Sequence, residues 1–140
     1  MDTKKFLMGT VAGGISYFFL GYLIYGMALT GFMGEHSTAN VQRPMEEMIW
    51  WSLLVGNFAG GAMLSYVFLK WANINSFGAG LSAGATLGFF FACTFDFVMY
   101  ATANLMDLTG IVTDVVAFSV MSALCGGVVA AVLGMGKKAA

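Results

Sequence analysis

The chain has 140 residues, of which 59% are hydrophobic and only 9% charged, and its formal net charge at pH 7 is −1. Soluble domains carry about 25% charged residues, so we expect lipid rather than water to surround this chain. The weak net charge gives no basis for nucleic-acid binding. The length leaves room for a single transmembrane domain, 1–140, and no separate soluble domain.

Four apolar segments are each long enough to cross a bilayer as a helix, which takes about 20 residues. They cover about 6–32, 48–69, 77–105 and 111–135, and a polar outer loop over 33–47 separates the first two. Asn75 or Ser76 is expected to cap the third helix, and Thr109 the fourth. The sequence therefore predicts an all-α integral membrane protein, a bundle of four transmembrane helices.

The basic residues indicate how this bundle is oriented. With four helices drawn, five lysines fall on one side of the membrane and Arg43 alone on the other. Lysine and arginine are enriched in cytoplasmic loops, so both termini are predicted to be cytoplasmic. The five lysines are Lys4, Lys5, Lys70, Lys137 and Lys138.

A weak internal similarity suggests two related hairpins. The stretch 21–28 is similar in pattern to 96–103, and Gly9 and Gly13 match Gly84 and Gly88 at the same offset. Such hairpins would form a parallel repeat about an axis along the membrane normal. Glycine-rich helices also resemble each other by chance, so repeat and coincidence both stay open.

Glycines at helical spacing are the expected packing surfaces, because close backbone approach drives helices together in lipid. The interpretation leaves open a tight monomer, a homodimer and a place in a larger membrane complex. The predicted packing ridges are formed by Gly80, Gly84, Gly88, Gly56, Gly60, Gly126 and Gly127.

Two acids lie within the predicted spans, Asp96 and Asp114. Ionisable groups inside a membrane are costly and are candidates for function. Asp96, Tyr100 and Asn104 recur every four residues, so a continuous helix would put them on one face. The sequence predicts a polar pocket for a ligand or ion lined by Asp96, Tyr100, Asn104, Asn57, Asp114 and Tyr25, although an interhelical hydrogen bond that only fixes packing would use the same residues.

The sequence shows no arrangement of a nucleophile with a base. Its single histidine, His36, falls in the outer loop, and no metalloprotease, phosphate-binding or hydrolase motif is present. We therefore expect that the protein is not an enzyme and that it has neither a metal site nor a cofactor.

Several short motifs resemble those of a family of small bacterial four-helix membrane proteins of unknown function. The motifs are Leu20-Gly21-x-x-x-Tyr25-Gly26, Gly88-Phe89, Asp96-x-x-x-Tyr100 and Asn104-Leu105. The resemblance covers nearly the whole chain and implies four helices and a place in the bacterial inner membrane. It implies no activity.

Two hypotheses about function follow from these features. In the first, the intramembrane pocket binds or transports a small solute, a proton or a cation. In the second, the protein is an accessory subunit that docks on a larger membrane complex through its glycine ridges and transports nothing.

Overall fold

The computed structural model describes residues 1–136, and within this range every regular element is a helix. Four stretches are long and apolar enough to cross a membrane: Thr3–Ala28, Trp50–Ala72, Phe77–Thr102 and Leu108–Gly134. The elements are α1 (Thr3–Gly21), the π-helix η1 (Tyr22–Ala28), α2 (Thr30–Glu35), the 3₁₀ helix η2 (Met45–Glu47), α3 (Trp50–Val67), the π-helix η3 (Phe68–Ala72), α4 (Phe77–Thr102) and α5 (Leu108–Gly134).

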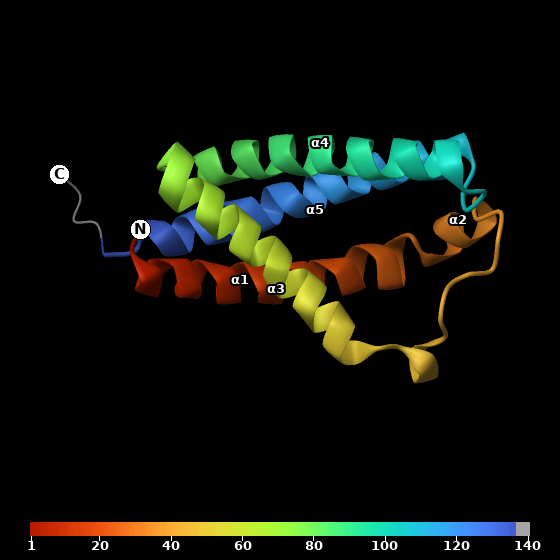
Figure 1. Ribbon diagram of the computed structural model, residues 1–140, viewed down its shortest axis with the longest axis horizontal. Coiled ribbons are helices and arrows are strands. Elements are labelled where there is room, and N and C mark those ends of the chain that lie inside the picture. Colours follow the sequence, from red (N-terminus) through yellow and green to blue (C-terminus); the bar gives the residue numbers. More distant parts are fainter. Residues whose placement is uncertain (137–140) are drawn as a thin grey trace.

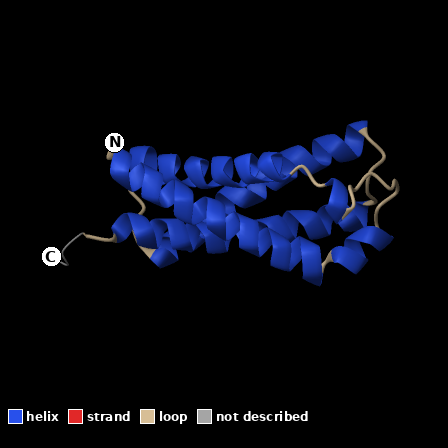
Figure 2. Cartoon of the chain, turned by 90° about the horizontal axis from the view of Figure 1, so that it is seen from below, coloured by secondary structure: helices blue, strands red, loops and turns tan. Residues whose placement is uncertain are grey.

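The four long helices form an elongated bundle with two distinct ends (Figure 1). The start of α1 and the end of α5 lie at one end, which we call the terminal end. The connections 36–49 and 103–107 lie at the other, the loop end. Helices α4 and α5 run side by side, whereas α3 crosses α1 obliquely and separates from the other helices towards the loop end. Figure 2 shows the same elongated arrangement from below.

Glycines bring α4 and α5 into close contact. A Cβ atom on Gly80 would collide with the backbone of Gly126, and one on Gly84 with the carbonyl of Ser122. Gly88 lies against the Ser122 side chain. Positions four residues apart on α4 thus meet positions four residues apart on α5, in antiparallel order. This is the close helix packing that small residues permit in lipid.

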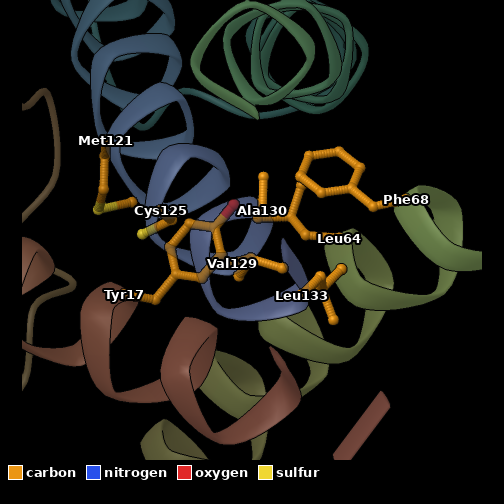
Figure 3. Close-up of a cluster of buried hydrophobic side chains, with 8 residues drawn as sticks. All are labelled: Tyr17, Leu64, Phe68, Met121, Cys125, Val129, Ala130 and Leu133. Carbon is orange, nitrogen blue, oxygen red and sulfur yellow. The ribbon is translucent and has the colours of Figure 1, made fainter. Parts of the chain in front are cut away.

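The second close contact joins α1 to α3. Gly13 lies directly on Gly61, and Gly9 lies on the Ser65 side chain. Tyr17 of α1 donates a hydrogen bond from Oη to Ser122 Oγ of α5, at 3.1 Å. The buried core lies where α1, α3, η3 and α5 meet (Figure 3). It consists of Tyr17, Leu64, Phe68, Met121, Cys125, Val129, Ala130 and Leu133.

The first predicted helix is not continuous over 6–32. It becomes a π-helix at Tyr22 and is interrupted at Leu29, after which α2 adds a short separate turn. The interruption leaves the carbonyl of Tyr25 without a regular helical partner, and the Thr30 hydroxyl donates to it at 2.7 Å. This local hydrogen bond offsets the cost of an open backbone group.

Other boundaries also differ from the predicted ones. Ser76 caps α4 as expected, but α5 begins at Leu108, and its N-cap is Asp107 rather than Thr109. The Asp107 carboxylate accepts from the Gly110 amide at 2.8 Å, so it pairs one of the amides that a helix leaves free at its start. Thr109 lies inside the helix and is not at the capping position. The predicted cytoplasmic lysines Lys137 and Lys138 lie outside the described residues.

The two predicted hairpins do not share one geometry. Helices α4 and α5 stay together along their length, whereas α3 leaves α1 towards the loop end (Figure 1). The structure therefore gives no support to the parallel repeat.

Candidate functional site

Two carboxyl groups from neighbouring helices meet near the loop end. Asp96 lies six residues before the end of α4, and Asp114 lies six residues after the start of α5. At about 1.5 Å per residue, both are roughly 9 Å inside their helix ends. The glycine contacts set this pairing, because the α4–α5 register places Asp114 opposite Ala92, one turn from Asp96.

Asp96 is buried in the seam between the helices. Its residue is only 4% exposed, and its Oδ2 atom has no hydrogen-bond partner among the described residues. The Asp114 side chain lies beside both the Asp96 carboxyl and the Tyr25 hydroxyl. Tyr25 comes from η1, so three separate elements contribute to the cluster, which we call the carboxyl pair site.

This arrangement favours a proton or a small cation. Two ionised carboxylates at close range in a low-dielectric environment repel each other strongly. No Lys or Arg pairs with either acid among the described residues, where the single ion pair is His36–Asp107. One proton shared by the pair, or one monovalent cation beside it, would reduce this repulsion and give the free oxygen of Asp96 a partner.

Asp96, Tyr100 and Asn104, which were predicted to share one face of α4, do not line one pocket. Tyr100 is 46% exposed on the outside of the bundle. Asn104 lies in the 103–107 connection, because α4 ends at Thr102, and its carbonyl accepts from the Thr38 hydroxyl at 2.7 Å. A rotation of about 100° per residue also carries Tyr100 some 40° away from Asp96 around the helix.

Asn57 belongs to a different part of the molecule. It donates from Nδ2 to the Leu53 carbonyl of its own helix at 2.8 Å, and it lines a cavity beside α3 that neither Asp96 nor Asp114 lines. The structure therefore brings Asp96, Asp114 and Tyr25 together and leaves Tyr100, Asn104 and Asn57 outside the site.

Most of the predicted glycine ridges are occupied within the chain. Gly80, Gly84 and Gly88 face α5, Gly126 faces α4, and Gly60 lies against the ring of Tyr17. Gly127 lies against the ring of Phe77. Gly56 is the exception, since a Cβ there would meet nothing within 4 Å. It lines the cavity beside α3 because the first half of that helix has separated from its neighbours.

A polar cluster at the loop end was not predicted from the sequence. His36 Nδ1 lies 2.7 Å from Asp107 Oδ2, and the Asp107 amide donates to the His36 carbonyl at 3.0 Å. Thr38 donates from its amide to the Leu105 carbonyl at 2.8 Å. These contacts fasten the segment after α2 to the start of α5. The residues are about 70 positions apart, and no sequence spacing links them.

The Asp107 carboxylate is held ionised by its surroundings. The Gly110 amide, and then the His36 ring, lower the pKa of Asp107 below its ordinary value. This group lies at the N-terminus of α5, where the helix dipole also favours a negative charge.

No three His, Cys, Asp or Glu side chains in the described part of the chain gather as a metal ion would require. The site is thus a pair of carboxyls with one tyrosine. Comparison with protein-family models, with curated protein sequences and with solved structures found no match to this chain.

Proposed function

We propose that this protein binds a proton or a small monovalent cation within the membrane, at the carboxyl pair site. The observation that carries the proposal is the nearly fully buried Asp96 carboxyl, whose free oxygen lies in the seam beside Asp114. A buried polar atom without a partner costs about 1–3 kcal/mol, and more when it is charged. A ligand that binds there removes this cost.

The distribution of charge supports an orientation with both termini in the cytoplasm. Lys4 and Lys5 start the chain at the terminal end, and Lys70 lies in η3 at the same end. Arg43 lies in the connection at the loop end. The positive-inside rule then places the loop end outside a bacterial inner membrane, so the site exchanges its ligand with the outer side.

Reconstituted vesicles test whether occupation of the site leads to transport. The wild-type protein, in vesicles that hold a pH-sensitive dye, is given an inward proton gradient, or an outward gradient of K⁺ or Na⁺ with a protonophore present so that protons enter as the cation leaves. We expect an ion flux in the wild type, and a reduction of about tenfold or more in Asp96→Asn and in Asp114→Asn. The amide keeps the shape of each side chain but cannot carry the charge that the ligand balances.

The matched control is Asp107→Asn, which removes an acid at the same end but outside the spans. It should leave the flux within about twofold of wild type. A wild-type flux that persists in both Asp96→Asn and Asp114→Asn would contradict the proposal.

The docking alternative has little of the predicted ridges left to use, because Gly56 is the one predicted ridge glycine that meets no other part of the described chain. Gly80, Gly84 and Gly126 already form the α4–α5 contact, so a partner helix could reach them only if the two helices separated. No feature of the described residues favours this second function over the first.

A further inference from the structure

A cavity lies beside the first half of α3. Its volume is about 900 Å³, and it is partly open to the surroundings. Sites for small molecules commonly measure about 300–1,000 Å³. The cavity exists because α3 packs on α1 through its second half only, where Gly61, Leu64 and Ser65 are buried.

The cavity wall changes in character along its length. Towards the middle of the bundle it is apolar and is formed by Met63, Phe91, Phe118 and Met121. The Tyr17 hydroxyl there already donates to Ser122. Towards the loop end the wall includes Gln42, Ser52 and the cation Arg43.

Arg43 is the charged residue of this wall. It makes no ion pair with any residue between positions 1 and 136. Glu46 and Glu47 follow it in η2 but do not line the cavity. A guanidinium group at the mouth of an apolar cavity matches a phosphate, to which arginine donates paired hydrogen bonds.

The length of the cavity matches one leaflet of a bilayer. Ile49 and Met63 both line it, and the helix between them rises about 21 Å at 1.5 Å per residue. The hydrocarbon of one leaflet is about 15 Å thick, and α3 is oblique to the other helices (Figure 1). The polar mouth lies at the loop end and the apolar part in the middle, as the head and the tail of a lipid do.

From these observations we propose that the cavity binds an anionic phospholipid, with its phosphate at Arg43 and an acyl chain between α3 and the rings of Phe91 and Phe118. This site is separate from the carboxyl pair site, and the inference does not depend on the proposed ion binding. The bound lipid covers apolar surface that the chain itself leaves open.

Native mass spectrometry of the full-length protein in detergent tests this inference. The protein is given equal amounts of phosphatidylglycerol and phosphatidylcholine with the same acyl chains. We expect preferential binding of phosphatidylglycerol, a loss of about fivefold in its binding in Arg43→Gln, and retention of most of it in Arg43→Lys. The fivefold figure corresponds to about 1 kcal/mol for one basic residue at a lipid headgroup.

A second variant tests the cavity rather than the charge. Gly56→Leu places a side chain where nothing lies within 4 Å of the added Cβ, so the fold has room for it while the cavity is reduced. It should lower the binding of both lipids. The control is Val55→Leu on the same helix, at a side chain that is 61% exposed and does not line the cavity.

Three results would overturn the inference. The first is equal binding of the two lipids by the wild type, and the second is an unchanged preference in Arg43→Gln. The third is a lipid-free dimer that Gly56→Leu dissociates, which would show that a second copy of the chain fills the cavity.

Discussion

Asp107 has two roles at the start of α5, as a helix cap and as the partner of His36. One of its oxygens accepts from the Gly110 amide and the other lies against the His36 ring. Because the pKa of the Asp107 carboxylate is lowered in the folded protein, the stability of the connection between α2 and α5 depends on pH at this residue.

The variant Asp107→Asn measures this response. Asparagine still caps a helix, so the variant loses mainly the stabilisation due to the negative charge. Because the pKa of Asp107 is lowered in the folded protein, this stabilisation is present above the ordinary pKa of about 4 and is lost as the pH falls through the lower folded value. We expect the melting temperature of the wild type in detergent to exceed that of Asp107→Asn at pH 7, and the difference to shrink as the pH falls below the ordinary carboxyl pKa of about 4. A difference that did not shrink as the pH fell below about 4 would contradict this assignment.

At the level of single residues, the sequence predicted Asp96, Asp114 and Tyr25 as pocket residues, but not that these three lie together apart from Tyr100, Asn104 and Asn57. A carboxyl among apolar residues of a spanning segment is conspicuous because its burial is costly. The relation of Asp96 to Asp114 depends on the register of α4 against α5, and its relation to Tyr25 on a π-helix, neither of which a residue pattern specifies. Tyr100 continues the four-residue spacing of the buried α4 residues, but its side chain is 46% exposed near the end of the helix, which the spacing does not predict.

Among the elements, the α4–α5 pair depends most directly on glycine. In Gly84→Ala the new methyl group would collide with the Ser122 carbonyl, which is backbone and cannot move aside easily. We expect a loss of about 1–3 kcal/mol in the free energy of unfolding, measured by titration with a denaturing detergent. Gly78→Ala on the same helix meets nothing within 4 Å and should be neutral, or stabilising by up to about 1 kcal/mol. Equal stabilities for the two variants would count against the close contact.

Helix α3 is expected to have two halves of different stability. Its buried residues all lie at or after Gly61, whereas the residues from Trp50 to Gly56 are exposed. Local opening is easiest where few apolar contacts hold a segment. Backbone amides of the first half should therefore exchange hydrogen faster than those of the second half, in mass-spectrometric exchange of the protein in detergent. Uniform protection along α3 would show that the first half is held by contacts that the single chain lacks.

The sequence predicted the number and type of long helices, but not how each one ends. Long apolar runs identify membrane helices because lipid requires every backbone group to be satisfied within the segment. The interruption at Leu29 has no proline to mark it, and the side-chain hydrogen bond that completes it, from Thr30 to the Tyr25 carbonyl, forms only in the folded chain.

On the scale of the whole molecule, the two ends should face opposite sides of the membrane. Two variants report on this orientation. One adds a cysteine at Asn40, in the connection at the loop end, and the other adds a cysteine at Ala72, in η3. We expect an impermeant maleimide to label Asn40→Cys in intact cells, and Ala72→Cys only after the cells are permeabilised. The unmodified chain, whose Cys93 and Cys125 lie within helices, sets the background. The opposite labelling pattern would invert the proposed orientation.

The overall shape could be predicted only in part, because composition specifies lipid as the solvent but not how the helices diverge. Glycine patterns indicated which faces pack. Five of the seven predicted ridge glycines belong to α4 or α5 and lie against the other helix of that pair, through its backbone or a side chain. They did not indicate that α3 would pack through one half alone. The cavity beside α3 forms because the first half of α3 separates from the other helices, and no local sequence pattern predicted it.

We propose above that the carboxyl pair site holds one positive charge. Infrared spectroscopy of the protein in membranes, at neutral pH and without small cations, measures protonated carboxyl groups directly. We expect a carboxylic-acid band in the wild type that is lost when Asp96 and Asp114 are both replaced by Asn and that weakens when a bound cation replaces the proton. A wild-type spectrum without that band, or a band that survives in the double variant, would contradict the proposal.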